Sequence, residues 1–147
     1  MHELAAKVLF DRAANELPRI AVNRRWVLNE AAFPTIDLTF QAESRTPLRL
    51  RLACRQFNEQ PPGIELLRPD GNFLAINAQN PGGATGVFNM SAHPKTGRPF
   101  VCMRGSLEYH THFSHIQDSW GQLAANDNFS LLGILYQLWS AWLKGAD

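Results

Sequence analysis

The stretch that decides the fold is residues 35–54, TIDLTFQAESRTPLRLRLAC. Apolar residues occupy every second position of residues 36–40, and leucines do the same in residues 48–52. This period of two predicts two strands that each bury one face. The short connector between them predicts antiparallel pairing in a meander with one face exposed to water. We expect Arg49 and Arg51 on that water-exposed face, where they would matter little for folding, and Cys54 buried on the opposite side.

The segments on either side extend this pattern. Residues 2–17 have a helix-forming composition with apolar residues at helical spacing, and Pro18 predicts the end of that helix. Residues 24–29 predict a strand before the central pair, and residues 64–67 predict a short strand after it. Residues 128–144 predict a C-terminal helix, with Asp127 or Asn128 capping its start and Gly145 its end. Its apolar stripe consists of Leu131, Leu135, Leu138 and Trp142.

A long irregular segment precedes the C-terminal helix. Its first part, residues 68–86, is rich in Gly, Asn and Pro, and Gly82, Gly83 and Gly86 are predicted hinges. These glycines lack the GxxxxGK[ST] pattern of a phosphate-binding loop, so an ordinary loop is predicted. The order of helix, three to four antiparallel strands, irregular segment and helix predicts a single two-layer α+β domain over residues 1–147.

Composition limits the partners. The 147 residues are 45% hydrophobic and 18% charged, with a formal net charge of +1. These values are typical of a globular protein and predict neither a nucleic-acid partner nor an anionic membrane partner. The sequence shows no apolar run of membrane-spanning length and no signal-peptide core, so a cytoplasmic location is expected. In that compartment Cys54 and Cys102 are expected to be free thiols.

Residues 93–120, HPKTGRPFVCMRGSLEYHTHFSHIQDSW, concentrate the reactive side chains. They contain four of the five histidines and one of the two cysteines, and therefore form the predicted active-site segment. One interpretation is a zinc site, because zinc accepts a thiolate, imidazoles and a carboxylate. The spacing matches no known structural-zinc pattern. The ligands of that site would be Cys102, Glu108, His110 and His115, with His112 as a spare.

The other interpretation makes Cys102 a nucleophile. It follows a short apolar segment, and the flanking Arg98 and Arg104 are expected to favour its thiolate. A cysteine in an apolar strand can also be no more than a small buried residue, and the local pattern leaves that alternative open. His93 is expected to hold a turn, and Trp120 is expected to anchor the core.

The order of landmarks along the chain resembles the ubiquitin-conjugating enzymes. The shared features are a Pro-Pro pair before a short strand, a His-Pro turn, an apolar-Cys-apolar segment and a Trp ahead of a leucine-rich helix. The matching residues here are Pro61, Pro62, His93, Pro94, Phe100, Val101, Cys102, Met103 and Trp120. Residues 102–115 also resemble a bacterial family described as predicted Cys-Glu-His-His metal-binding proteins, found beside ubiquitin-like, activating-enzyme and deubiquitinase genes.

The resemblance implies a ubiquitin-conjugating-like domain and a function in transfer of a ubiquitin-like protein, in a bacterial system of antiphage defence. Cys102 would accept that protein as a thioester from an activating enzyme and pass it to an amine of a protein target. The N-terminal helix would face the activating enzyme. No cofactor is implied, with zinc as the alternative. A non-catalytic adaptor of the same fold is a third possibility.

The resemblance also assigns supporting roles. His110, His115 and Asp118 are candidate bases for the target amine, and Glu108 is expected to support catalysis. Lys95 stands where the family has an oxyanion-supporting Asn after His-Pro. That role is therefore expected either to be lost or to pass to another donor, such as Asn89 or a local histidine.

Overall fold

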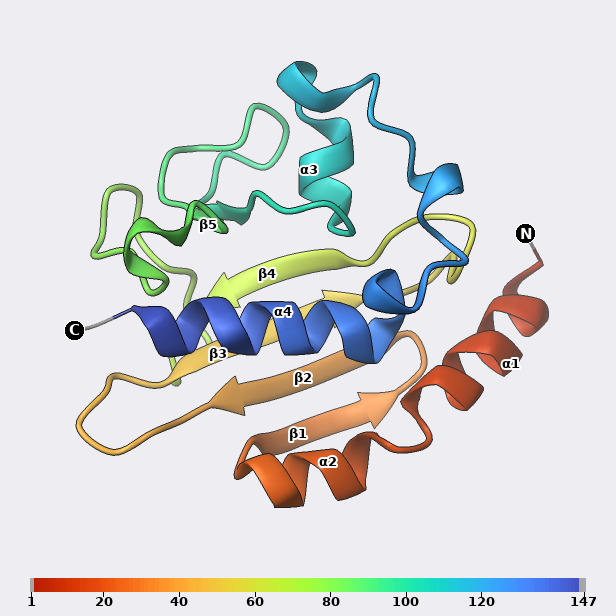
Figure 1. Cartoon of the computed structure of the whole chain (residues 1–147), viewed down its shortest axis with the longest axis horizontal. Coiled ribbons are helices and arrows are strands. Elements are labelled where there is room, and N and C mark those ends of the chain that lie inside the picture. Colours follow the sequence, from red (N-terminus) through yellow and green to blue (C-terminus); the bar gives the residue numbers. More distant parts are fainter. Residues whose placement is uncertain (1, 146–147) are drawn as a thin grey trace.

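A four-stranded antiparallel sheet forms the centre of the computed structural model, which describes residues 2–145 (Figure 1). The strands pair in chain order, so the predicted meander and its fourth strand are confirmed. The first strand begins at Val27 instead of residue 24, because a helix occupies the residues before it. The strands are β1 (Val27–Ala32), β2 (Thr35–Phe40), β3 (Leu48–Ala53) and β4 (Gly63–Leu67).

The N-terminal region forms two helices, α1 (Glu3–Ala14) and α2 (Leu17–Arg24), so the prediction of one helix ending before Pro18 is wrong. Pro18 lies in the first turn of α2, where a missing backbone N–H costs no helical hydrogen bond. Arg25 ends α2 in the left-handed conformation, with φ of 61°, and its N–H bonds back to the carbonyl of Ala21. The chain then turns directly into β1.

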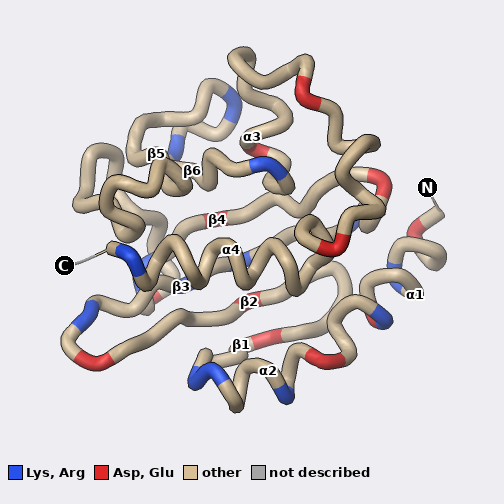
Figure 2. Tube along the Cα trace, in the orientation of Figure 1, with Lys and Arg blue, Asp and Glu red and all other residues tan. Residues whose placement is uncertain are grey.

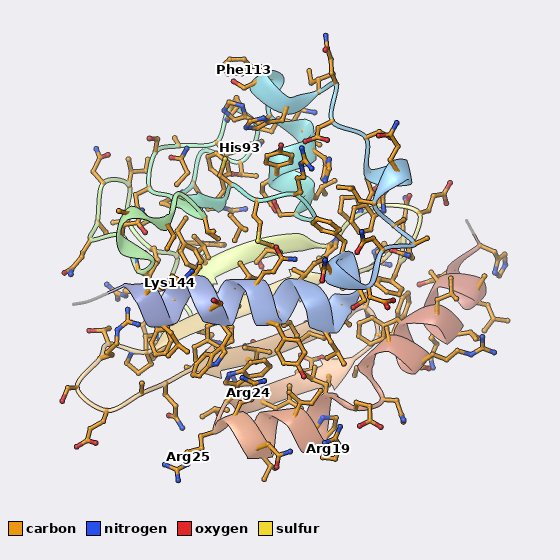
Figure 3. All side chains as sticks on the ribbon, in the orientation of Figure 1. Arg19, Arg24, Arg25, His93, Phe113 and Lys144 are labelled. Atoms are coloured by element: carbon orange, nitrogen blue, oxygen red, sulfur yellow. The ribbon has the colours of Figure 1, made fainter. Side chains whose placement is uncertain are left out.

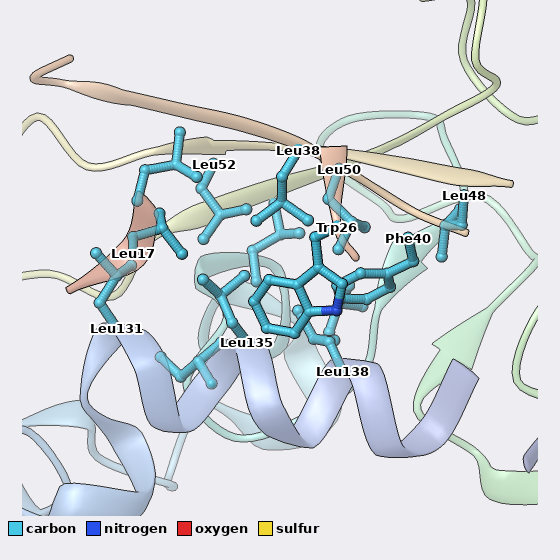
Figure 4. Packing of buried hydrophobic residues seen from close by; sticks show 14 of the residues in the cluster. Leu17, Trp26, Leu38, Phe40, Leu48, Leu50, Leu52, Leu131, Leu135 and Leu138 are labelled. Atoms are coloured by element: carbon cyan, nitrogen blue, oxygen red, sulfur yellow. The ribbon is translucent and has the colours of Figure 1, made fainter. Parts of the chain in front are cut away.

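Helix α4 (Leu131–Lys144) covers the inner face of the sheet. The predicted apolar stripe is confirmed, since all four of its residues are buried. In Figure 4 the labelled leucines of α4 face those of β2 and β3. Leu50 stands opposite Leu38 on one side and Leu66 on the other, so the inward side chains form a continuous layer. Burial of these side chains is the main stabilising contribution to the two-layer fold.

The start of α4 differs from the prediction. Ser130 is its N-cap, and its Oγ accepts a hydrogen bond from the Gly133 N–H at 3.0 Å. The predicted caps lie instead in a preceding 3-10 turn, η4 (Asp127–Phe129). Gly133 permits this tight approach, because a Cβ there would lie 2.4 Å from the carbonyl oxygen of Asp127. At the other end, Gly145 is the predicted C-cap.

The outer face of the sheet is more enclosed than predicted. Arg49 and Arg51 do point to this face, but both are only partly exposed and both are in ion pairs. Arg49 pairs with Asp37, which is 5% exposed, and Arg51 pairs with Glu65. The expectation of a plain water-exposed face is therefore wrong for Arg49, because polar side chains on β2 and β4 were in reach of both arginines.

The irregular segment packs beyond β4 (Figure 1). It contains a two-stranded ribbon of β5 (Phe88–Asn89) and β6 (Phe100–Val101), followed by the short helix α3 (Leu107–Thr111). The 3-10 turns η1 (Gly83–Thr85), η2 (Phe113–His115) and η3 (Trp120–Gln122) complete it. Figure 3 shows Phe113 at the outer end of this region, with His93 nearer the sheet.

Charged residues of both signs are distributed over the elements (Figure 2). Within residues 2–145, no helix has the length and apolar character that a membrane span requires.

Candidate active site

Cys102 follows β6 directly and lies at the start of the loop that leads to α3. Its backbone N–H donates to the carbonyl of Val87 at 2.7 Å, which fixes the chain where the ribbon ends. The side chain is partly exposed, and partial burial raises the pKa of its thiol. Cys54, by contrast, is 2% exposed, and burial raises the pKa of its thiol to about 12. Cys102 is therefore the accessible cysteine, while Cys54 is buried as predicted.

His115 is the side chain that the structure brings to Cys102. Its Nε2 lies 3.9 Å from the Cys102 Sγ, within reach of a hydrogen bond to sulfur. The two residues come from different elements, Cys102 from the end of β6 and His115 from η2. A cysteine and a histidine at this separation can exchange a proton, as nucleophilic cysteines require. Residues 113–118, which include His115, also line an open hollow of about 740 Å³.

The two arginines that flank Cys102 in sequence do not promote its thiolate. Arg98 lies over the ring of Phe73 and approaches Glu65. The Arg104 Nε donates to the Asp118 Oδ2 at 2.9 Å. The expectation that these arginines favour the thiolate is wrong, because their charges are directed to other partners and burial dominates the thiol. Deprotonation of Cys102 therefore depends on a nearby base.

The ring of Tyr109 stacks on the imidazole of His115. Their centroids are 4.1 Å apart and their planes differ by 13°. The Tyr109 hydroxyl donates to the Asp118 Oδ2 at 2.6 Å. Tyr109 was not among the predicted site residues. It lies on α3, whereas His115 lies on η2 beyond the extended residue His112, so no regular spacing in the sequence connects them.

Asp118 anchors this arrangement. The hydrogen bond from Tyr109 lowers the pKa of its carboxyl, and the charge of Arg104 adds to that effect. A carboxylate that is stabilised by two donors on one oxygen is a weak proton acceptor. The predicted role of general base therefore fits Asp118 poorly, and its contacts hold neighbouring side chains in place instead.

His110 lies close by, but both of its ring nitrogens are hydrogen-bonded to backbone groups. Its Nε2 accepts a hydrogen bond from the Gly105 N–H at 3.1 Å, and its Nδ1 donates to the carbonyl of Asp118 at 3.0 Å. The ring thereby joins the loop after Cys102 to the loop after η2. This pattern assigns the neutral tautomer with the proton on Nδ1. His110 is positioned as a structural bridge.

Glu108 points the other way, toward the sheet edge. Both of its carboxylate oxygens lie within hydrogen-bond distance of the Ile64 N–H, at 3.0 and 3.2 Å. Burial raises the pKa of this carboxyl to about 7, despite the opposing effect of that N–H. The structure therefore separates Glu108 from the Cys102–His115 pair.

His93 and Trp120 have the structural positions that the sequence predicts. His93 is 1% exposed, donates through Nε2 to the Glu108 carbonyl at 2.8 Å, and accepts from the Lys95 N–H through Nδ1. Trp120 is buried, and its Nε1 donates to the carbonyl of Asn58 at 3.1 Å. His93 thus holds its own turn closed and attaches it to α3.

Neither Asn89 nor His112 has a described contact with the Cys102 thiol, although the ring of His112 lies near that of His115, with centroids 5.7 Å apart. The amide oxygen of Asn89 accepts from the Ser91 N–H, so its carbonyl group serves the local turn. The Nδ1 of His112 accepts from the Ser114 N–H, and its ring stacks on Phe113. Nothing in these contacts identifies the oxyanion donor that the resemblance requires.

The four residues of the zinc interpretation do not converge. Glu108 is bonded to the sheet edge and His110 uses both nitrogens on the backbone, so only Cys102 and His115 face each other. Over residues 2–145, no three His, Cys, Asp or Glu side chains are grouped closely enough to hold a metal ion. The arrangement does not fit the predicted set of ligands.

In comparisons with known proteins, no protein-family model and no curated protein matches this chain.

Proposed function

We propose that this protein is a cysteine-dependent acyltransferase of the ubiquitin-conjugating type. Cys102 accepts the C-terminal carboxyl of a ubiquitin-like protein from the thioester of an activating enzyme. It then passes that acyl group to an amine of a protein target, in a bacterial antiphage system. The observation that supports this most directly is the partly exposed Cys102 thiol with the His115 Nε2 at 3.9 Å.

The chemistry needs a base at Cys102. Because burial raises the pKa of the thiol, the thiolate is scarce near neutral pH without help. In the first step, His115 takes the thiol proton through Nε2 while sulfur attacks the incoming thioester carbonyl. The bond to the activating enzyme's sulfur breaks, and that sulfur leaves as a thiolate, which takes the proton from His115 and returns the imidazole to its neutral form. The acyl group is then bound to Cys102.

In the second step, the target amine attacks the Cys102 thioester. The new amide bond forms as the carbon–sulfur bond breaks, and the Cys102 sulfur leaves as a thiolate. His115 accepts the proton that the attacking nitrogen must lose. The same Cys–His pair thus serves both transfers, and neither transfer consumes a cofactor.

The fold agrees with this proposal at a coarser level. An N-terminal helix, a four-stranded antiparallel meander, an irregular segment that bears the cysteine and a C-terminal helix follow one another in the order that the resemblance implies. Fold alone does not identify function. The proposal therefore depends on the Cys102–His115 geometry.

The direct test is a charging assay. Incubation with the activating enzyme, ATP and the ubiquitin-like protein is expected to give an adduct that a thiol reductant removes. Cys102→Ala is expected to abolish it, whereas Cys54→Ala, the matched control, is expected to retain it. An adduct that persists in Cys102→Ala would refute the assignment. Absence of any adduct from the correctly folded wild-type protein would favour the adaptor alternative.

A further inference from the structure

We infer that Tyr109 is the positioning residue of the site, holding the His115 imidazole against the Cys102 thiol by ring stacking. This inference rests on the proposed role of Cys102 as the nucleophile. Tyr109 does not touch Cys102 in any described contact; it acts through His115. The distinction matters because a positioning residue changes the rate without contributing a reacting atom.

His115 needs such a support. It belongs to η2, a turn of three residues, and the side chains next to it, Ser114 and Ile116, are exposed. A partly exposed imidazole on a short turn has several accessible rotamers. The stacking contact with Tyr109, at 4.1 Å and 13°, selects an orientation in which Nε2 faces the thiol.

Tyr109 can provide that support because hydrogen bonds hold it both at its backbone and at its hydroxyl. Its backbone N–H donates to the Oγ of Ser106, the N-cap of α3, at 3.1 Å. Its hydroxyl donates to Asp118, which in turn accepts from Arg104. A chain of contacts therefore runs from Arg104 through Asp118 and Tyr109 to His115.

Helix α3, which carries Tyr109, is itself attached to the sheet. The Leu107 N–H donates to the carbonyl of Pro62 at 2.8 Å, and the Glu108 carboxylate accepts from Ile64. Both contacts attach the first turn of α3 to the chain at β4. Tyr109 thus extends the framework of the sheet to a turn that is otherwise held by local backbone bonds.

The stacked ring also favours the protonated state that each transfer produces. When His115 accepts a proton it becomes cationic, and a cation above an aromatic face is stabilised by the electron density of the ring. The Tyr109 hydroxyl donates to an ionised carboxylate, which increases that density. Orientation and stabilisation of the imidazolium therefore act on the same step.

Alkylation of Cys102 by iodoacetamide, followed by mass analysis of the Cys102 peptide, tests the inference without any ubiquitin-like partner. Tyr109→Leu removes the ring and is expected to slow alkylation about fivefold or more, approaching the rate of His115→Gln. Tyr109→Phe keeps the ring but loses the hydroxyl bond to Asp118, and its rate is expected to fall between those of the wild type and Tyr109→Leu. Phe113→Leu is the matched control, because that ring stacks on His112.

The double variant distinguishes positioning from general damage. If Tyr109 acts through His115, Tyr109→Leu slows alkylation no further in a His115→Gln background. An equal slowing in both backgrounds would overturn the inference, as would a wild-type rate in Tyr109→Leu. A thermal melt of each variant identifies loss of folding. If Tyr109→Leu proves to be unfolded, Tyr109→Phe tests the inference in its place: an alkylation rate as low as that of His115→Gln would refute a role for the ring.

The amine-discharge assay tests the inference within the proposed reaction. Tyr109→Leu is expected to lower kcat for discharge about tenfold while leaving KM for the amine nearly unchanged. If Cys102 forms no thioester but the alkylation pattern holds, the acyl-transfer proposal fails and the positioning role stands. If charging succeeds but the alkylation pattern is absent, the acyl-transfer proposal stands and the positioning role of Tyr109 fails.

Discussion

Arg49 binds Asp37 through two hydrogen bonds, from Nε to Oδ1 at 2.9 Å and from Nη2 to Oδ2 at 2.7 Å, on the outer face of the sheet. Burial by itself would raise the pKa of the Asp37 carboxyl. The hydrogen bonds from Arg49 and Asn29, with the charges of Arg49 and Arg51, outweigh it and leave that pKa below its ordinary value. A buried carboxylate thus depends chiefly on the Arg49 guanidinium, which supplies both its hydrogen bonds from an arginine and part of its charge balance.

Arg49→Lys is therefore expected to destabilise the fold. Lysine cannot reproduce the two-bond geometry, and Asp37 would be left with an incompletely paired charge. The expected loss is about 1–2 kcal/mol, or about 3–6 °C in the melting temperature. Arg51→Lys is the control, because Arg51 makes one described bond to a more exposed Glu65. Equal melting temperatures for the two variants would contradict the importance of the Asp37 pair.

Glu108 predicts a pH dependence of stability. Its pKa is about 7 in the folded protein against an ordinary value of 4.5, so the folded state retains a proton that the unfolded state releases in this window. The free energy of unfolding is then expected to fall as the pH rises from about 4.5 to 7, by about 3 kcal/mol from this group. Urea titrations at several pH values measure the slope.

Glu108→Gln is expected to flatten that slope. The amide oxygen can still accept from the Ile64 N–H, but no proton is released. The control is Glu16→Gln, which removes an exposed carboxylate that pairs with Arg19. The control should retain the wild-type slope; if Glu108→Gln retains it too, the burial of Glu108 is not the cause.

The two neighbouring histidines are expected to respond in opposite ways. His110→Ala removes two bonds to backbone groups and is expected to lower stability by about 1–3 kcal/mol. His115→Gln is expected to leave the melting temperature nearly unchanged and to slow Cys102 alkylation. Melting curves and alkylation rates of the same two preparations provide the comparison. A stable His110→Ala with slow alkylation would assign the base to His110 instead.

The cysteines should differ in reactivity by location. Cys102 is expected to react with a thiol reagent in the native protein, whereas Cys54 is expected to react only after unfolding. The fraction of each thiol labelled is measured by peptide mass in buffer and in denaturant. Native labelling of Cys54 at the rate of Cys102 would mean that β3 opens far more readily than a buried core strand should.

The elements that the sequence predicts correctly are those with a regular period. The alternation in residues 36–40 and 48–52 and the stripe of α4 identify their inward faces, because each side chain's direction follows from its position in the element. The predicted ends of the helices and strands were less accurate. Pro18 is compatible with a helix start as well as a helix end. Ser130 was not selected as the N-cap because Asp127 and Asn128, shortly before it, are residues of the same capping type.

The candidate site was only partly predictable, because it is built from contacts across an irregular segment. The concentration of His, Cys and acidic residues located the segment, and the apolar-Cys pattern singled out Cys102. The sequence could not separate His115 from His110, since the difference is whether the ring nitrogens meet a thiol or the backbone. It also gave no reason to select Tyr109.

The attachment of α3 to β4 has a consequence for how other chains can approach. β4 is an edge of the sheet, and three of the backbone groups on or beside its open side are already hydrogen-bonded. Pro62 accepts from Leu107, Ile64 donates to Glu108, and Leu66 accepts from the Leu74 N–H at 3.1 Å. An exposed edge of this kind invites strand addition and aggregation. Here these three groups are bonded within the chain, which hinders the addition of a peptide strand along this part of β4.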